Sequence, residues 1–396
     1  MHNGVKMKFL LLSGGSGGHL IPALALAETL EPSGRCQLIS TRRPVDRLLS
    51  DGGQPNVEWS TVPLQPFTPL WRWASPGYVA NQLSAIRQVW AMVRRTRPDV
   101  VVGFGGYLSA VGVLAARANG IPAVIHEQNF LPGRANRLLA RCADAVAVSF
   151  PETQRHLRPR EAVQVTGNPT HFRPGAISFA DARSSFGFDA ERPVLLIAGG
   201  SQGSHTVNRL AMEMWEQWPA GERQRVQVIH LAGPAGAATV QRGYERLGVR
   251  AAVFPFLRRM ETALTAATLA ISRAGATTLS ELLSFALPSV LIPYPHAGAH
   301  QRANARWLQT AGGAVVLEEE ALTGERLGAE VRRMLASPAR LEGMRQALRA
   351  RSDGSAAEKL AELVRRVARR AFVRAEQVEA RTRADAQGVH PSTGSG

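Results

Sequence analysis

The feature that most constrains this chain is a strand–turn–helix device that occurs twice, about one domain length apart. In each copy an apolar run leads into a glycine-rich turn, and a helical pattern follows. The first turn lies within Gly14–Gly18 and ends at His19, and the second lies within Gly199–Gly203. Glycine permits close approach of a ligand, and a helix start presents unpaired N–H groups that suit phosphate. Two copies therefore predict two Rossmann-like domains that share a cleft and bind a phosphate-bearing ligand.

Strand-like apolar runs alternate with helical patterns along most of the chain. Continuous Val, Ile and Leu runs are typical of buried parallel strands, and their alternation with helices favours βαβ units in an α/β fold. In the first half we expect strands at Phe9–Ser13, Cys36–Ser40, Val57–Val62, Val100–Gly103, Ala123–His126, Ala145–Val148 and Gln164–Thr166. In the second half we expect them at Val194–Ala198, Val226–Leu231, Ala252–Phe254, Leu269–Ser272, Ser289–Ile292 and Ala314–Leu317.

The length of 396 residues, with 45% hydrophobic content, is sufficient for two ordinary domains. We expect an N-terminal Rossmann-like domain over residues 7–168 and a C-terminal one over 169–353. A helix over 354–375 follows, and the low-complexity end predicts a disordered tail over 376–396. Met7 directly precedes the first predicted strand, so the six residues before it are either an extension or the result of a mis-called translation start.

The net charge of +16 favours an anionic partner such as a phospholipid, a nucleic acid or a phosphorylated substrate. Two cysteines, Cys36 and Cys142, are too few for a metal or disulfide framework, which fits a reducing cytosol. The apolar runs are shorter than the roughly 20 residues that span a bilayer, and the first residues do not read as a signal peptide. We expect a soluble or peripherally bound protein.

Several polar residues follow predicted strands, where open α/β sheets bind ligands. His19 is either a catalytic base or a helix cap, and the run from His126 to Asn129 faces either a ligand or solvent. Glu281, about one turn into a helix, accepts hydrogen bonds from a ribose diol or only stabilises the helix start. Gln301 contacts sugar hydroxyls or belongs to a solvated helix start.

The stretch from Pro63 to Arg97 interleaves aromatic and basic residues. Such a pattern suits attachment to an anionic membrane surface, although a nucleic-acid site or an ordinary amphipathic helix would have the same composition. The aromatic residues are Phe67, Trp71, Trp73, Tyr78 and Trp90, and the basic ones are Arg72, Arg87, Arg94, Arg95 and Arg97.

Taken in order, these motifs resemble the MurG-type N-acetylglucosaminyltransferases of peptidoglycan synthesis, over about Met7 to Arg370. The motifs are Gly14–His19, Gly105–Tyr107, His126–Asn129, Gly167–Pro169, Gly199–Gly203 and Arg273–Glu281. The resemblance implies a GT-B fold, in which two Rossmann-like domains face a central cleft and a C-terminal helix returns to the first domain.

The same resemblance implies an inverting hexosyltransferase that moves GlcNAc from UDP-GlcNAc to the muramyl 4-hydroxyl of undecaprenyl-diphospho-MurNAc-pentapeptide, converting lipid I to lipid II. The reaction needs a base for the hydroxyl and a holder for the leaving diphosphate, and it requires neither a metal nor a cofactor. The implied partners are UDP-GlcNAc, lipid I and the anionic inner leaflet, with no nucleic acid, so the enzyme would bind peripherally at the cytoplasmic face of the cell membrane.

Carried over residue by residue, the resemblance implies His19 as the base, with Glu127 as the next choice. The residues implied to contact the donor, or the acceptor diphosphate in the case of the first turn, are Ser16, Gly17, Gly18, Asn129, Ser201, Leu257, Ala276, Thr277, Thr278, Glu281 and Gln301. This chain departs from the family pattern where it has His171, with Arg173 close by, in place of an arginine, and where it has His300 in place of a glutamine.

Three alternatives remain at this point. An NAD-dependent oxidoreductase normally has an acid at the end of its second strand, and Arg42 and Arg43 stand there instead, which argues against NAD but tolerates NADP. A basic membrane- or nucleic-acid-binding protein explains the charge but not the strand-end motifs. A UDP-GlcNAc epimerase or another lipid glycosyltransferase of the same fold is the closest rival.

Overall fold

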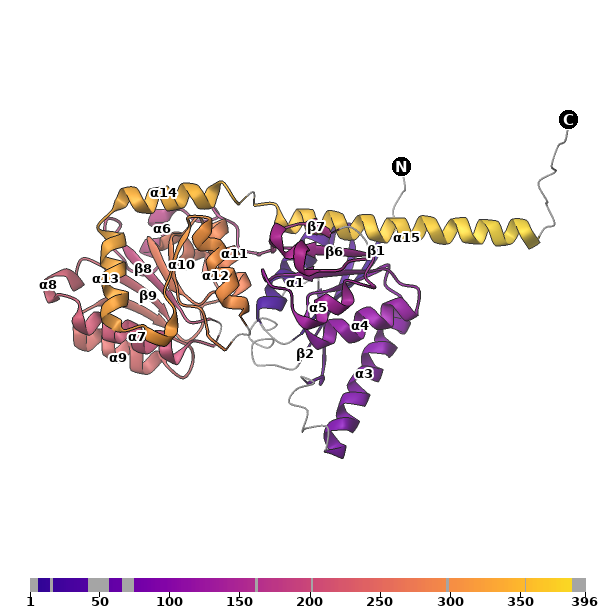
Figure 1. Cartoon of the computed structure of the whole chain (residues 1–396), viewed down its shortest axis with the longest axis horizontal. Coiled ribbons are helices and arrows are strands. Elements are labelled where there is room, and N and C mark those ends of the chain that lie inside the picture. Colours follow the sequence, from indigo (N-terminus) through magenta and orange to yellow (C-terminus); the bar gives the residue numbers. More distant parts are fainter. Residues whose placement is uncertain are drawn as a thin grey trace.

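A computed structural model describes residues 6–14, 17–41, 57–65, 75–160, 163–200, 202–296, 299–352 and 354–386. Two parallel sheets, one in each half of the chain, form side-by-side bodies (Figure 1). This arrangement confirms the predicted α/β fold of two Rossmann-like domains. The predicted division between residues 168 and 169 stays a prediction.

The first sheet has seven strands in the order β3-β2-β1-β4-β5-β6-β7, all parallel. The strands are β1 (Met7–Ser13), β2 (Gly34–Thr41), β3 (Val57–Val62), β4 (Val100–Gly103), β5 (Ala123–Glu127), β6 (Ala145–Val148) and β7 (Val163–Val165). Its helices are α1 (Gly17–Leu30), α3 (Pro76–Thr96), α4 (Gly106–Ala118) and α5 (Arg134–Leu139), with short 3₁₀ turns η1 (Glu31–Ser33) and η3 (Pro151–His156).

The second sheet has six parallel strands in the order β10-β9-β8-β11-β12-β13. The strands are β8 (Val194–Ala198), β9 (Gln227–Leu231), β10 (Arg250–Phe254), β11 (Leu269–Ser272), β12 (Ser289–Leu291) and β13 (Ala314–Val316). The helical segments are α6 (Phe179–Ser184), α7 (His205–Gln217), α8 (Ala220–Arg223), α9 (Ala237–Leu247), α10 (Met260–Ala266), α11 (Ala276–Ser284), α12 (His300–Thr310), η4 (Glu319–Ala321), α13 (Gly324–Leu335) and α14 (Pro338–Arg349).

The strand order reverses beside the first strand of each sheet, between β1 and β4 and between β8 and β11. Leu12 pairs with Gly103 at the first of these points, and Ala198 pairs with Ser272 at the second. Ligands of open α/β sheets bind outside the carboxyl ends of the strands at such a switch point. Each glycine-rich turn that the sequence repeats therefore lies at the binding crevice of its own sheet.

The last helix, α15 (Ala356–Ala386), leaves the second body and lies along the first (Figure 1). Leu360, Leu363, Val364 and Val367 are buried there in one core cluster with β1, α1 and β4. The expectation of a disordered tail from residue 376 is wrong for residues 376–386, because α15 continues through them. This stretch is rich in Ala, Glu and Arg, which are good helix formers, and it contains no glycine or proline.

Helix α3 is amphipathic and extends away from the first body (Figure 1). It buries Gln82, Ala85, Val89 and Val93 and begins with proline, whose missing N–H costs nothing at a helix start. Trp90 packs against the core. Four residues of the predicted membrane motif, namely Phe67, Trp71, Arg72 and Trp73, lie outside the described residues.

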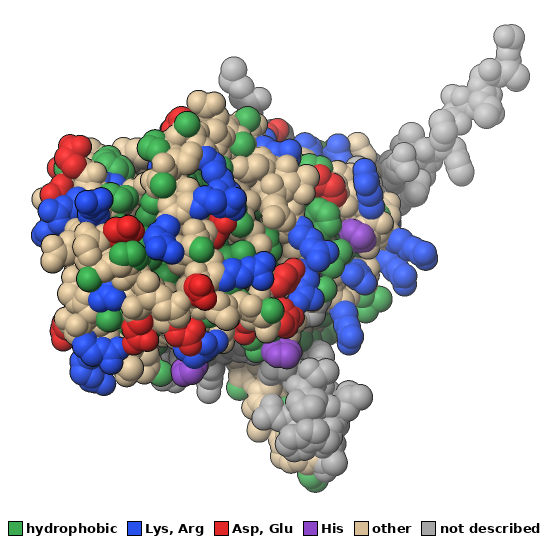
Figure 2. All heavy atoms as spheres, turned by 60° about the vertical axis from the view of Figure 1, so that its left-hand side comes forward, with side chains coloured by type: hydrophobic (Ala, Val, Ile, Leu, Met, Phe, Trp, Pro, Cys, Tyr) green, Lys and Arg blue, Asp and Glu red, His purple; other side chains and the backbone are tan. Residues whose placement is uncertain are grey.

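Acidic and basic side chains are interspersed over the face shown in Figure 2. The positive charge of the chain is therefore not gathered into one field on that face. Within the described ranges, every helix is too short or too polar to pass through a bilayer.

Candidate active site

A cavity of about 880 Å³ lies between the two bodies, at the carboxyl ends of both sheets. Its wall contains segments from β1–α1, the loop after β5, the turn after β8, the loop after β10 and the starts of α11 and α12. The predicted site residues that line it are Gly18, His19, Asn129, His171, Leu257, Ala276, Thr277, Thr278, Glu281 and Gln301. Ser16 and Ser201 lie outside the described residues, and Gly17 is described only as the first residue of α1.

The His19 ring is held on the cavity wall by its own turn. Its Nδ1 lies 2.6 Å from the carbonyl oxygen of Gly14, so Nδ1 carries the proton and donates it. The Nε2 lone pair is therefore left to accept a proton. A Cβ at Gly105 would lie 3.2 Å from Nε2, and one at Gly106 would lie 3.1 Å from the Gly14 oxygen. Both glycines lie where β4 leads into α4, and both have positive φ. Because glycine has no Cβ, this turn leaves room for the His19 ring.

Two positions of the second glycine turn, Gly199 and Gly203, are packed too tightly to tolerate a side chain. A Cβ at Gly199 would lie 2.4 Å from the Ser204 nitrogen, and one at Gly203 would lie 2.3 Å from the Ala232 oxygen. Ser204 is the N-cap of α7, since its hydroxyl accepts a hydrogen bond from the Val207 N–H at 3.4 Å. A glycine-rich turn that leads into a helix start suits an anion, because the first N–H groups of a helix have no partner within the helix.

Glu281 is a buried carboxyl group in the cavity wall, 7% exposed. It forms no ion pair within the part of the chain that the structure describes. Burial raises the pKa of this carboxyl to about 8. A partly desolvated acid of this kind suits hydrogen bonding to neutral hydroxyl groups.

Gln301 is oriented by its own oxygen. Its Oε1 accepts hydrogen bonds from the Ala274 N–H at 3.1 Å and the Tyr294 N–H at 3.0 Å. The amide nitrogen has no hydrogen bond among the described residues, and Gln301 lines the cavity. The cavity lining also includes Phe256, Leu257 and Met260, whose apolar side chains suit a planar ring.

Hydrogen bonds join the two bodies across the cavity. Thr277 Oγ1 donates to the Gly18 oxygen at 3.1 Å, and His300 Nδ1 donates to the Leu131 oxygen at 2.8 Å. Asn304 bonds the loop after β5 twice, by accepting from the Phe130 N–H and by donating to Asn129 Oδ1. The loop and the first turn are thereby held against α11 and α12.

The alternative base, Glu127, is not brought to the cavity. It is 2% exposed, and its two oxygens accept from the Asn129 N–H, Asn129 Nδ2, the Gly133 N–H and Asn136 Nδ2, at 2.9 to 3.2 Å. Four donors occupy the lone-pair positions of a carboxylate. The surroundings of Glu127 thus favour bracing of the loop that carries Asn129, and its role as the second choice of base stays a prediction.

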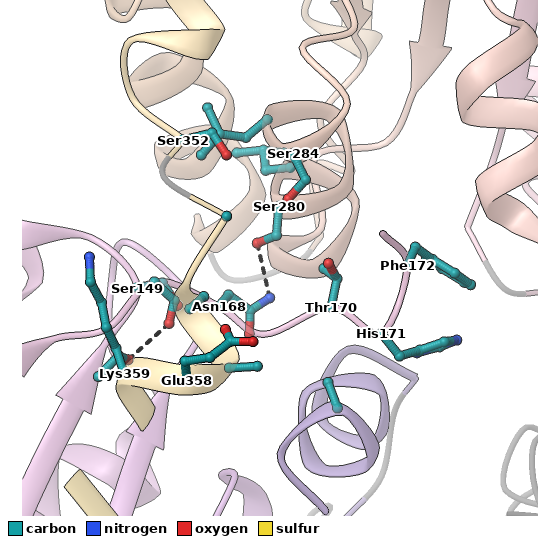
Figure 3. Close-up of a pocket in the computed structure, with 18 of the residues that line it drawn as sticks. Ser149, Asn168, Thr170, His171, Phe172, Ser280, Ser284, Ser352, Glu358 and Lys359 are labelled. Carbon is teal, nitrogen blue, oxygen red and sulfur yellow. Dashed lines mark hydrogen bonds between the residues drawn. The ribbon is translucent and has the colours of Figure 1, made fainter. Parts of the chain in front are cut away.

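A smaller cavity of about 320 Å³ lies where the chain crosses between the bodies (Figure 3). Asn168 donates there to Ser280 Oγ at 3.0 Å. His171 lines both cavities, whereas Arg173 lines only this one. Burial lowers the pKa of the His171 ring. Of the two candidates for the missing family arginine, the one that reaches the larger cavity is therefore uncharged at neutral pH.

Sequence reasoning gave no role to Arg273, Ser204 or Asn304. Arg273 is 7% exposed, and its Nη2 donates to Ser204 Oγ at 2.8 Å. Asn304 follows His300 by four residues, so both share one face of α12. That spacing was the available signal, because two polar residues one turn apart point to the same neighbour.

Two family models match most of the chain. The N-terminal domain of glycosyltransferase family 28 matches residues 9–148, and the C-terminal domain of that family matches residues 194–364. The chain belongs to glycosyltransferase family 28.

Within glycosyltransferase family 28 the chain is of the MurG type, as its motifs predicted, and it is an enzyme. It is 37% identical over 375 residues to the UDP-N-acetylglucosamine--N-acetylmuramyl-(pentapeptide) pyrophosphoryl-undecaprenol N-acetylglucosamine transferase of Anaeromyxobacter dehalogenans strain 2CP-C, covering 92% of this chain and 94% of the relative. The crystal structure of Acinetobacter baumannii MurG matches with a TM-score of 0.70 at 28% identity, covering 91% of this chain and all of that one.

The fold alone is shared more widely in and beyond this family. A UDP-N-acetylglucosamine 2-epimerase from Listeria monocytogenes matches with a TM-score of 0.63 at 14% identity, over 89% of this chain and 94% of that one. The overall architecture therefore does not separate a transferase from an epimerase. The sequence identity with the transferases does.

Proposed function

We propose that this protein transfers N-acetylglucosamine from UDP-N-acetylglucosamine to the 4-hydroxyl of an undecaprenyl-diphosphate-linked N-acetylmuramyl-pentapeptide. The observation that carries the proposal is the cavity that both glycine-rich turns enter, with His19 on one side and Glu281 and Gln301 on the other. The names of the MurG-type relatives support this pair of substrates.

In this proposal the donor binds to the second body. The diphosphate lies at the turn before α7 and at the start of α11, where Thr278 adds a hydroxyl donor. Thr277 lines the same wall, and its hydroxyl hydrogen is donated to the Gly18 oxygen. Glu281 bonds the ribose hydroxyls, Gln301 donates to the sugar, and the backbone beside Leu257 contacts the uracil. Backbone N–H groups there stabilise the charge that develops on the departing diphosphate.

The reaction itself is a displacement at the anomeric carbon. His19 Nε2 removes the proton from the acceptor hydroxyl, whose oxygen forms the new bond to that carbon. The bond from the anomeric carbon to the β-phosphate oxygen breaks, and its electron pair leaves with UDP. Attack from the face opposite to the leaving group inverts the configuration.

We test the substrate pair by measuring UDP release with purified protein and UDP-N-acetylglucosamine, with and without the lipid-linked acceptor. Release that depends on the acceptor, together with a disaccharide lipid product, is expected. Conversion of the donor at equal rate without acceptor would establish an epimerase or hydrolase and reject the proposal.

We further propose that the first body attaches to the anionic cytoplasmic face of the cell membrane. Leu83, Leu114 and Leu138 are exposed on the neighbouring helices α3, α4 and α5, and exposed arginines such as Arg87 and Arg94 accompany them on α3. Exposed apolar side chains beside basic ones suit an anionic interface.

A vesicle experiment tests this attachment. The triple variant Leu83→Gln/Leu138→Gln/Arg94→Glu should bind anionic vesicles at least about tenfold more weakly than wild type, and binding of wild type should weaken with salt. The control Arg326→Glu changes the same charge on α13 of the other body and should leave binding intact. Equal partitioning of all three proteins would reject the attachment face.

A further inference from the structure

A buried ion pair between Arg273, which lines the cavity, and Glu319, which does not, joins three segments of the second body. The Arg273 side chain is 8% exposed, and its Nη1 donates to the Ile292 oxygen at 3.1 Å and to the carboxylate of Glu319. Its Nη2 donates to Ser204 Oγ. Glu319 lies in η4, and its side chain is 17% exposed. One guanidinium therefore connects η4, the end of β12 and the start of α7.

Ser204 transmits this connection to the glycine-rich turn. Its hydroxyl caps α7 and accepts from Arg273 at the same time. Since Gly199 has no room for even a Cβ beside the Ser204 nitrogen, the turn and Ser204 cannot shift independently. The orientation of Arg273 thus bears on the shape of the whole anion-binding turn.

The two glutamates that flank Glu319 face a different partner. Glu318 and Glu320 both pair with Arg302, at 2.8 and 2.6 Å, and the Arg302 side chain is 36% exposed. Among these three consecutive carboxylates, only the central one reaches the buried guanidinium. Glu318 therefore serves as a control of equal charge for substitutions of Glu319, because it lies one residue away and pairs with a different arginine.

We propose that Glu319 is a positioning residue for the donor diphosphate, acting through Arg273 and Ser204. Glu319 does not line the cavity, and its effect is to hold the guanidinium where its second nitrogen anchors the N-cap of α7. Without the Glu319 carboxylate, Nη1 of the buried Arg273 retains only the Ile292 oxygen as a partner. The uncompensated guanidinium then turns toward solvent through the cavity. On that path lies the Tyr294 ring, whose centroid is 5.4 Å from Arg273 Cζ. Ser204 then loses its anchor. The proposal rests on the donor site proposed above.

The experiment measures the dissociation constant of UDP by calorimetry and the kinetic constants for UDP-N-acetylglucosamine. Glu319→Ala removes the carboxylate that contacts Arg273, and Glu319→Asp shortens the side chain that carries it. Each variant should raise the dissociation constant of UDP and the KM for the donor about tenfold, because loss of a helix cap has an effect of this size. Their kcat at saturating donor should change less. Glu319→Gln keeps the reach and an acceptor oxygen, so it should stay within about threefold of wild type.

The control Glu318→Ala should match wild type. The proposal is overturned if Glu319→Ala and Glu319→Asp bind UDP as Glu318→Ala does, or if their weaker binding only follows the unfolded fraction seen in thermal unfolding. It is also overturned if Glu319→Gln binds as weakly as Glu319→Ala, since charge and not position would then matter. Failure of wild type to bind UDP would overturn the donor site as well.

Discussion

His19 has a hydrogen bond at one ring nitrogen, Nδ1, and none at the other, Nε2, among the described residues. The bond from Nδ1 to the Gly14 oxygen fixes the ring and its tautomer, so the proton acceptor is Nε2. The first turn thus supplies both the proposed base and its orientation, and Gly105 and Gly106 leave room for the ring. This arrangement is the residue-scale basis of the proposed chemistry.

His19→Ala should lower kcat by roughly 10²–10⁴-fold, the usual contribution of general base catalysis. UDP affinity should remain within about twofold, because the proposed UDP contacts lie on the other body. Single-turnover kinetics with saturating lipid acceptor and UDP calorimetry measure the two quantities. Full turnover by His19→Ala would make His19 a helix cap only.

Glu281 gives the unliganded protein a specific pH dependence. The folded carboxyl has a pKa of about 8 against an ordinary 4.5, so the folded state holds the proton more tightly than the unfolded state. The tighter proton binding stabilises the folded state. This stabilisation is fully present below pH 4.5 and is lost as the pH rises through about 8. Between pH 5 and 8 the melting temperature of wild type should therefore fall more steeply than that of Glu281→Gln. Thermal unfolding at a series of pH values checks this.

The exposed Glu222 provides the control for that experiment. Glu222→Gln should leave the pH profile of wild type unchanged. If the melting temperatures of Glu281→Gln and of wild type fall by equal amounts between pH 5 and 8, the buried carboxyl of Glu281 does not titrate as expected.

At the scale of elements, the sequence predicted the strands well and the long-range side-chain partners poorly. Val100–Gly103 and Leu269–Ser272 have the predicted bounds because a buried parallel strand is a short apolar run that ends at a turn signal. The partner of Arg273, however, lies 46 residues away in η4. Nothing local distinguishes Glu319 from its two neighbours, since only the path of the folded chain selects it.

The hydrogen-bond partners of Glu127 could not be predicted from the sequence for a related reason. Its position at the end of β5 is the position of a catalytic acid or base in this kind of sheet. The donors at Gly133 and Asn136 that occupy it come from the following loop and from α5, and a loop conformation is not encoded in strand periodicity.

Helix α15 should be essential to the first body. Leu360 is fully buried there, so Leu360→Ala should lower the free energy of unfolding by about 2–5 kcal/mol through lost burial and the cavity left behind. Phe372, 51% exposed on the same helix, is the matched control, and Phe372→Ala should change stability by less than about 0.5 kcal/mol. Chemical denaturation measures both. Equal effects would mean that α15 is not part of that core.

At the scale of the whole molecule, the hydrogen bonds from Thr277, His300 and Asn304 hold the two bodies together across the cavity. A substrate that enters the cavity must work against these bonds or replace them. We expect ligand exchange to require relative movement of the two bodies, since a substrate that replaces these bonds separates the segments that they join.

UDP should stabilise the whole protein, because it binds only the folded state. At about 100 times its dissociation constant the gain is about 2.7 kcal/mol, visible as a higher melting temperature. NAD and NADP at equal concentration should give no shift. A shift with NADP and none with UDP would reject the donor assignment and favour a dinucleotide-binding enzyme.

The return of α15 to the first body sets an order of events during synthesis. The helix that fills the core beside β1 and α1 leaves the ribosome after every other described element. The first body must therefore wait with an apolar groove open until the second body has been made, although N-terminal domains usually fold first. We expect nascent chains that stop before residue 356 to expose this groove to chaperones, and completion of the last helix to be the step that commits the protein to its native state.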